Sequence, residues 1–435
     1  MNTFIRLKYS ILTLIIAFTA FGCSLNSSDN NEERATINGS VEEETAQQKS
    51  KISNIEGATV TAAQVSSNGS LEMMDGVETE TNASGSFTLD VDVESAQNIV
   101  IIAEKEGKTW MGYLSGKVEN GNSYTLKPIN SESSAETEVF TKLVASGNAD
   151  IVNKADVESV VSSQVAAQIR SNVSYATTIA TGLKNAAEAR AEYYNETLGS
   201  ESQAALESTF EAMAQAQFQL ESELAAAASA EQRAEARDAF VESSVNAYLN
   251  AGLDASSSAK AIEMWSRIFV NSLTSVSSEV EDNARMQTSV LVAAAIDGAI
   301  RAEAEASNMS ETSRQAIIDA GIQLRSAVKA SAGVASDIKA AFDEYHEEVR
   351  STMENDAAFE ASVIIEIDTE INSPSGAKSS FTSSISSVLN ASTVVNTYQT
   401  FYSDINGIVE TTMNGAGQTE IETVTELMIL INLAS

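Results

Sequence analysis

The side chains most suited to covalent or acid–base chemistry are few, because the 435 residues contain one cysteine, Cys23, and one histidine, His346. Cys23 follows a short basic start and an apolar run over residues 11–18. That arrangement is typical of a secretion signal. The run is shorter than the roughly 20 apolar residues that a membrane-spanning helix needs. The thiol therefore stands at the end of a targeting segment, where it is available for modification.

The start of the chain resembles a bacterial lipoprotein signal, in which Arg6 and Lys8 precede the apolar run and Ala20-Phe21-Gly22 precedes Cys23. The resemblance implies that Cys23 receives a diacylglyceryl group, that the chain is cut before it, and that the new amine is acylated. Ala20 departs from the commoner leucine at its position. An ordinary signal peptide and a retained anchor are the alternatives. We expect a signal peptide over 1–22 and lipidation at Cys23.

Residues 23–34 follow as a small, polar and acidic stretch with too little apolar surface to fold, so we expect a flexible tether. Ser24 is not the aspartate that holds related lipoproteins on the inner membrane in enterobacteria. The expected location is therefore the cell envelope, as an outer membrane lipoprotein that is periplasmic or exposed at the surface. The expected membrane contact is the lipid at Cys23.

The remaining candidates for acid–base or metal chemistry are His346 and two acids, Glu366 and Asp368. Tyr345 belongs to an apolar helical stripe, so we expect His346 on the exposed flank of that helix, stabilised by Asp343. Glu366 and Asp368 lie in an apolar segment, where burial would raise a carboxyl pKa as a general acid requires. The simpler expectation is that their helix turns both acids outward. We therefore expect no catalytic residue, no cofactor and no metal site.

The charge balance excludes several partners. The chain has 26 Lys and Arg against 61 Asp and Glu, a net charge of −35. Affinity for nucleic acids and anionic lipid surfaces depends on Lys and Arg, so neither is an expected partner. With its one cysteine lipidated, the chain has no internal disulfide and must rely on its core.

Between about Ala35 and Leu126 the apolar residues recur with a period of two, which predicts short β-strands. Residues 98–103 instead form a continuous apolar run, as expected of a strand that is covered on both faces. Trp110 and Tyr113 have opposite parity in one strand, so we expect one in the core and the other at an edge. Asn-Gly, Ser-Gly and Glu-Gly turns separate the strands. The pattern predicts a small antiparallel sandwich.

Three blocks of this region resemble the carboxypeptidase regulatory-like, or transthyretin-like, domain. They are Gly39-Ser40-Val41, Ile55-Glu56-Gly57-Ala58-Thr59-Val60, and Thr81-Asn82-Ala83-Ser84-Gly85-Ser86-Phe87-Thr88-Leu89. The last is the specific one, because a tight turn at Gly85 precedes a strand that buries Phe87 and Leu89. The insertion over 42–51 is longer than usual. The resemblance implies a non-catalytic β-sandwich at 35–128 that serves as a spacer or binding module.

After Pro128 the period changes to that of helices. Leu206, Phe210, Met213, Gln217, Leu220 and Leu224 form a bundle seam with one polar layer at Gln217. Three further apolar stripes begin at Ile262, Ile338 and Val394. We predict a helical domain over 132–435 with about eight to ten helices. The fold class is therefore α+β multidomain, a small antiparallel β-sandwich followed by a large all-α bundle. Few core contacts are expected across the boundary.

These features favour a non-catalytic structural or interaction module of the cell envelope, such as an adhesin or scaffold with a protein or glycan partner. The alternative is a surface lipoprotein that binds a glycan or another ligand, in a pocket between helices or on an aromatic face. An enzyme or a membrane-active helical effector is a third possibility, weakened by the absence of nucleophile, phosphate-binding and zinc-protease motifs from the sequence.

The anchor yields a direct test. A Cys23→Ser chain should incorporate no labelled palmitate, because the thiol that accepts the lipid is gone, and it should remain uncleaved or be released. A Ser24→Ala chain should be labelled as the wild type is. Label in the Cys23→Ser chain would overturn the predicted site.

Overall fold

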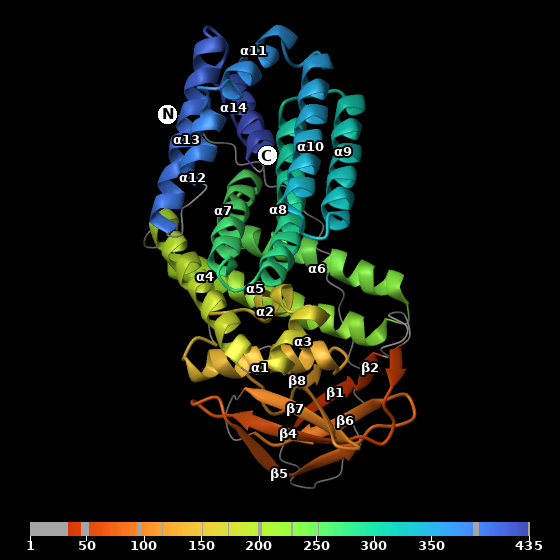
Figure 1. The fold of residues 1–435 in the computed structure, drawn as a ribbon. Helices are drawn as coiled ribbons and strands as arrows, with labels where there is room; N and C mark the ends of the chain where they lie inside the picture. Colours follow the sequence, from red (N-terminus) through yellow and green to blue (C-terminus); the bar gives the residue numbers. More distant parts are fainter. Residues whose placement is uncertain are drawn as a thin grey trace, which may run out of the picture. The chain divides into compact units, whose positions relative to one another are not determined.

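The computed structural model describes residues 34–44, 52–93, 98–114, 116–149, 151–172, 174–198, 202–227, 229–250, 252–385 and 391–433. The expected signal peptide, Cys23 and the tether up to residue 33 lie outside these ranges. Arg34–Ser435 forms one compact unit. It consists of N-terminal β-sheets followed by a large helical region (Figure 1).

The β region has two facing sheets that enclose one apolar core. The first has strand order β6-β1-β9 and the second β5-β4-β7-β8. The strands of the two sheets are β1 (Ala35–Ser40), β4 (Thr59–Val65), β5 (Leu71–Glu80), β6 (Ser86–Val91), β7 (Ile99–Lys105), β8 (Lys108–Tyr113) and β9 (Ser123–Thr125). A small hairpin pairs β2 (Glu42–Glu44) with β3 (Ile52–Asn54). Within the described strands, neighbours are antiparallel except β1 and β9, which run parallel.

The predicted periods are confirmed in β6 and β7. In β6, Phe87, Leu89 and Val91 are buried and alternate with more exposed residues. Gly85 before this strand has φ +72°, in the left-handed region that glycine adopts without strain. In β7, all residues from Ile99 to Ala103 are buried. The second sheet is therefore covered on both faces, and β7 is one of its two central strands.

The first helix, α1 (Ser131–Ala145), covers the outer face of the second sheet. Phe140 of α1 stacks on Tyr113 of β8 with ring centroids 4.2 Å apart, and both join a core cluster with Val100 and Ile102. Trp110 points to the other face, into the sandwich core. The expectation that only one of Trp110 and Tyr113 is in a core is wrong, because each face of the strand has its own core.

Hydrogen bonds also attach α1 to the edge of this sheet. The Ser133 hydroxyl donates to the carbonyl of Met111 at 2.7 Å, and the amide of Met111 donates to the Ser134 hydroxyl at 2.9 Å. Met111 lies in β8, an edge strand whose outward backbone groups would otherwise be open to another chain. Core contacts and hydrogen bonds thus cross the region around Pro128, where few core contacts were expected.

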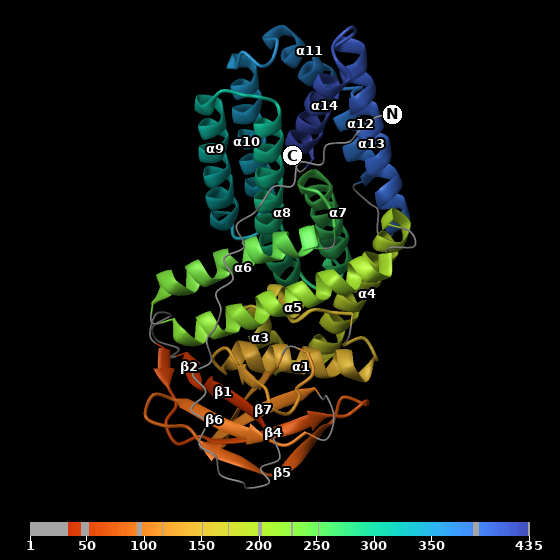
Figure 2. The same cartoon turned by 180° about the vertical axis from the view of Figure 1, so that it is seen from behind.

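The described residues contain fourteen helices rather than the eight to ten expected, because short helices interrupt the long ones. After α1 these are α2 (Lys154–Val160), α3 (Ser163–Ser171), α4 (Ser174–Leu198), α5 (Ser202–Ala226), α6 (Ala230–Asn250), α7 (Ala255–Leu273), α8 (Ser278–Ala306), α9 (Glu311–Ala330), α10 (Ala335–Asn355), α11 (Ala361–Ile371), α12 (Ala377–Ile385), α13 (Ala391–Thr412) and α14 (Gln418–Asn432). Both views show α5 and α6 side by side (Figures 1 and 2). No helix among the described residues is long and apolar enough to span a membrane.

One continuous apolar core runs through the helices from α1 to α14. The predicted stripes supply it: Trp265 and Phe269 of α7, Phe342 of α10, and Tyr398 and Phe401 of α13 are all buried in this core.

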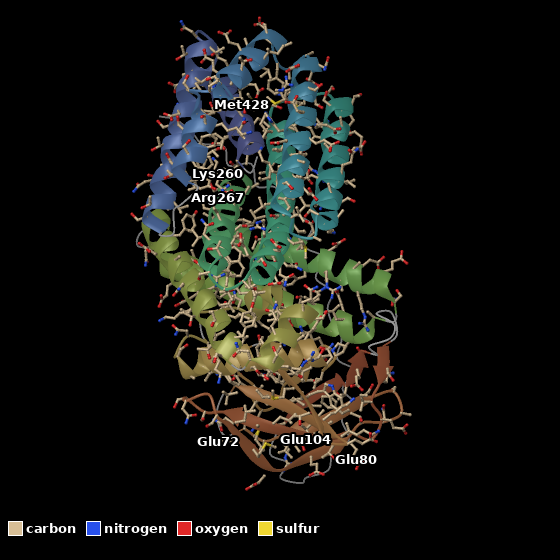
Figure 3. The ribbon with its side chains drawn as sticks, viewed as in Figure 1. Glu72, Glu80, Glu104, Lys260, Arg267 and Met428 are labelled. Carbon is tan, nitrogen blue, oxygen red and sulfur yellow. The ribbon has the colours of Figure 1, made fainter. Side chains whose placement is uncertain are left out.

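Polar contacts tie α7 to the last helices. Lys260 forms an ion pair with Glu426 of α14 at 2.6 Å, and Arg267 donates to the Tyr398 hydroxyl of α13 at 3.0 Å. Figure 3 labels Lys260 and Arg267 on α7 and Met428, a core residue of α14. The N-terminal end of α7 is thereby fixed against α14 and its middle against α13.

The attachment of α1 changes which fragment should be soluble. A fragment of residues 35–128 leaves the face with Val100, Ile102 and Tyr113 uncovered, so it should self-associate more strongly than a fragment of residues 35–149, in which α1 covers that face and exposes only its own Val139 and Leu143. Phe140→Ala in the longer fragment should lower the free energy of unfolding by about 3 kcal/mol, as expected for a buried phenylalanine. Size-exclusion chromatography with light scattering and urea denaturation measure both effects. Equal behaviour of the two fragments would contradict this role of α1.

Candidate functional site

The structure corrects the expected environment of His346. The side chain is buried, at 5% exposure, and its Nε2 lies 2.9 Å from Oδ1 of Asp368. Asp343 instead pairs with Lys339. The apolar stripe of α10 correctly marks one buried face, but α11 packs against the flank that carries His346 and brings Asp368 to it. The pair links α10 to α11.

The two acids of α11 differ in their surroundings. Glu366 is exposed, as expected. Asp368 is half-buried, and besides His346 it has Arg350 nearby, with Nε 3.4 Å from its Oδ2. No group of three or more His, Cys, Asp or Glu side chains in the described part of the chain could hold a metal ion. Cys23 lies outside that part.

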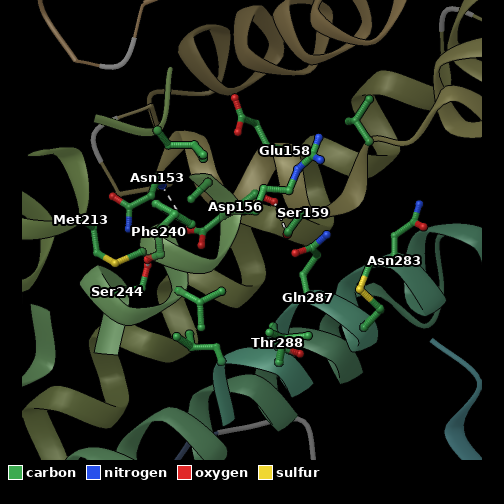
Figure 4. Close-up of a pocket in the computed structure, with 18 of the residues that line it drawn as sticks. Asn153, Asp156, Glu158, Ser159, Met213, Phe240, Ser244, Asn283, Gln287 and Thr288 are labelled. Carbon is green, nitrogen blue, oxygen red and sulfur yellow. Dashed lines mark hydrogen bonds between the residues drawn. The ribbon is translucent and has the colours of Figure 1, made fainter. Parts of the chain in front are cut away.

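A cavity of about 710 Å³ lies among α2, the pair α5–α6 and α8, and it is the best-formed candidate site. Figure 4 shows side chains from these elements converging on it, with Glu158 and Ser159 of α2, Met213 and Phe240 of α5–α6, and Gln287 of α8. The volume is within the range of about 300–1,000 Å³ that is typical of small-molecule sites. Sequence reasoning missed it, because its lining comes from elements far apart in the chain.

The wall formed by α5 and α6 is apolar. Leu220 and Leu224 of α5 pack with Ala236 and Phe240 of α6 in a small core of their own, apart from the main helical core. Leu220, Leu224 and Phe240 also line the cavity. The predicted seam is therefore confirmed at Leu220 and Leu224, which are buried, whereas Phe210 and Met213 are half-buried. Gln217, the expected polar layer, is 2% exposed.

In the cavity wall, the half-buried Lys127 joins three elements through an ion network. Its Nζ lies 2.8 Å from Glu136 of α1 and 2.8 Å from Glu158 of α2. Gln217 of α5 donates to the same Glu158 at 3.0 Å.

Lys154 of α2, which is buried, extends this ion network. It pairs with Glu221 of α5 at 2.9 Å and donates to the carbonyl of Tyr113 at 2.6 Å. The two lysines thus connect the end of the β region with α1, α2 and α5.

The carboxyls of this network have shifted pKa values. Burial raises the pKa of Glu136 to about 7, and the nearby charge of Glu158 adds to the rise while Lys127 opposes it. Burial also disfavours charge on Glu158, but Lys127 and Lys154 outweigh it and lower its pKa. The same two acids raise the pKa of Lys127 against the effect of burial. Near neutral pH, Glu136 is therefore the member of the network whose protonation changes most readily.

Arg190 of α4 occupies another part of the cavity lining. Its guanidinium lies 4.9 Å from the ring centre of Phe210 and 5.1 Å from that of Trp265. It donates to Asp156 at 3.0 Å and to the carbonyl of Ile151 at 3.1 Å. Cation–π contacts and ion pairing together hold this side chain in one position.

Nε1 of Trp265 and Nδ2 of Asn153 are buried N–H donors of the lining without a hydrogen-bond partner among the described residues. Trp265 is 6% exposed, so its donor is removed from bulk water. Leaving such a group unpaired costs on the order of 1–3 kcal/mol. A ligand or ordered water in the cavity would offset that cost.

The charge of the lining differs from that of the whole chain. It holds five cations and five acids, namely Lys127, Arg190, Arg233, Arg237 and Lys329 against Glu132, Glu136, Asp156, Glu158 and Asp238. The chain as a whole has 26 cations against 61 acids. The cavity is therefore locally neutral in a strongly acidic protein, and a ligand need not be a cation to enter it.

Searches of family models, curated proteins and solved structures found no match to this chain. The site is therefore interpreted from its own geometry, and no family is assigned.

The raised pKa of Glu136 predicts a pH dependence of stability. Below about pH 4.5 the group is protonated in both states, and between about 4.5 and 7 the folded chain keeps a proton that the unfolded chain has lost. Its contribution to stability is therefore lost as the pH rises towards 7. Glu136→Gln should remove up to about 1.4 kcal/mol per pH unit from the slope of stability against pH in this window.

Urea denaturation at several pH values measures that slope. Glu104→Gln, at the exposed end of β7, is the matched control and should leave it unchanged. A Glu136→Gln slope equal to that of the wild type would show that Glu136 titrates as it does in the unfolded chain.

Proposed function

We propose that this protein is a lipid-anchored, non-catalytic binding protein of the cell envelope, and that the cavity among α2, α5–α6 and α8 holds a small-molecule ligand. The observation that carries the proposal is the cavity itself, with an apolar wall, ten charged side chains in balance, and unpartnered buried donors at Trp265 and Asn153. Ligand sites in proteins combine these features.

The geometry favours ligand binding over a purely structural role. A scaffold or adhesin acts through its surface and has no use for a cavity of about 710 Å³ that leaves buried donors unpaired. Side chains such as Asp156 and Arg190 are already held in contacts with one another, which suits a rigid binding site.

The β region is proposed to be a carboxypeptidase regulatory-like spacer between the anchor and the helices. The left-handed Gly85 and the burial of Phe87 and Leu89 after it support this reading of the turn and strand. The two faces of its second sheet are occupied by the sandwich core and by α1, so we place the ligand site in the helical region. The proposed location is the outer membrane, through lipid at Cys23.

The proposal is tested by asking whether the cavity is occupied. The chain should be released from its membrane in mild detergent and analysed by native mass spectrometry. We expect a bound small molecule that is lost in Met213→Trp, because the larger ring fills the space beside α5. Met73→Trp is the matched control, since Met73 is 54% exposed on β5, and it should retain the molecule.

Loss of the molecule from both variants would place the ligand elsewhere. If the wild type carries no molecule and no compound in a library of metabolites raises its melting temperature, the proposed function is wrong.

A further inference from the structure

The cavity has N–H donors that are not committed to other groups. Nδ2 of Asn153 and Nε1 of Trp265 are two buried examples. Arg237 of α6 lines the cavity, is exposed, and has no carboxylate within ion-pair distance among the described residues. A ligand that satisfies these groups must bring acceptor oxygens.

The carboxylates of the lining are largely paired within the protein. Glu136 and Glu158 pair with Lys127, Asp156 with Arg190, and Asp238 with Lys329. Glu132 remains, in the first turn of α1, where the helix N-terminus stabilises its negative charge. The amide oxygens of Asn283 and Gln287 are further acceptors of the lining, so the feature that distinguishes a charged ligand from a neutral one is the open guanidinium of Arg237.

Contacts between helices bring Arg237 and two amides to one end of the cavity. Lys329, near the C-terminal end of α9, pairs with Asp238, the neighbour of Arg237. The carbonyl of Gly333, just after α9, accepts from Arg285 of α8 at 2.9 Å. Arg285 lies between Asn283 and Gln287, and both amides line the cavity. This end therefore offers a guanidinium and the side-chain amides of Asn283 and Gln287, of which Nδ2 of Asn283 also donates to the carbonyl of Val160 at 3.5 Å.

The rest of that wall is apolar. Phe240 and Val241 follow Arg237 by about one turn of α6, and Leu224 of α5 and Leu291 of α8 also line the cavity. A single open guanidinium binds one planar carboxylate through two parallel hydrogen bonds and balances its single charge, whereas a multiply charged phosphate needs further cations.

We infer that the cavity binds an organic carboxylate with an apolar body, whose carboxylate pairs with Arg237 and the amides of α8 while its body lies along the apolar wall of α5–α6. The inference rests on the proposed function and names the ligand class of the same site. The surrounding protein is strongly acidic, so a carboxylate is held by these local donors and not by the overall field.

Decanoate, decanol and decyltrimethylammonium test this inference, because they share a tail and differ in the charge of the head. Isothermal titration calorimetry should use residues 24–435, which keep the whole Arg34–Ser435 unit, at probe concentrations below micelle formation. Decanoate should bind about tenfold more tightly than decanol, as expected for one charge-assisted hydrogen-bond pair. The ammonium probe should bind more weakly than either, although the net charge of the protein favours it.

Arg237→Gln should reduce the affinity for decanoate to that for decanol and leave decanol unchanged. Arg314→Gln changes a half-buried arginine of α9 that pairs with Glu311 outside the cavity; it is the control and should keep the preference for decanoate. Melting temperatures verify that both variants fold.

Equal binding of decanoate and decanol, tightest binding of the ammonium probe, or an unchanged preference in Arg237→Gln would overturn the carboxylate inference and leave a ligand-binding cavity in place. Binding of none of the three probes would also overturn it. The proposed function would then depend on the occupancy seen by native mass spectrometry.

Discussion

The pairing of Lys127 with Glu136 and Glu158 is the interaction on which the arrangement of this molecule depends. It joins the segment after β9 to α1 and α2, and Gln217 connects the same Glu158 to α5. Removing these charges from water is costly unless every partner is in place, so the network tolerates one arrangement of the four segments. That arrangement fixes the positions of α1, α2 and α5 around the cavity. Among the buried acids of the described residues, Glu136 and Glu221 pair with Lys127 and Lys154, whereas Asp156 pairs with Arg190.

The sandwich and the helices are consequently less separate than the change of period suggests. The second sheet is sandwiched between its partner sheet and α1, with Trp110 in one core and Tyr113 in the other. Ser133 and Ser134 occupy the backbone groups of Met111 at the sheet edge. Lys154 then reaches from α2 to the end of β8 at the carbonyl of Tyr113. Helix α1, which covers the second sheet, is also the first layer of the helical region. It forms part of the cavity wall.

The periodicity of the apolar residues predicted correctly which residues are buried. It did not predict which elements pack against them. The alternation of β6, the continuous run of β7 and the stripes of α7, α10 and α13 all point to buried faces that the structure has. The environment of His346 could not be read in this way, because Asp368 comes to it on a separate helix that packs against the flank of the stripe. The cavity was hidden for the same reason. Lys127, Glu158 and Gln217 are unremarkable in sequence, and only the glutamine at a seam position hinted at a buried polar layer.

The two ends of the pair α5–α6 are held by different contacts. The start of α5 and the end of α6 belong to the main core through Ala205 and Tyr248. The far halves pack on each other through Leu224 and Phe240, and α6 meets α9 through the exposed ion pairs Lys329–Asp238 and Arg325–Glu242. Surface ion pairs contribute little, about 0–1 kcal/mol each, because water replaces them readily. Moving the far half of α6 away from α9 therefore leaves the small core between α5 and α6 intact. Moving the near end of α6 would expose the main helical core. The far half of α6, on the side where Arg237 lies, is therefore held by its own small core with α5, by the ion pairs to α9, and by the pair of Arg233 with Glu42 of β2 at 3.7 Å.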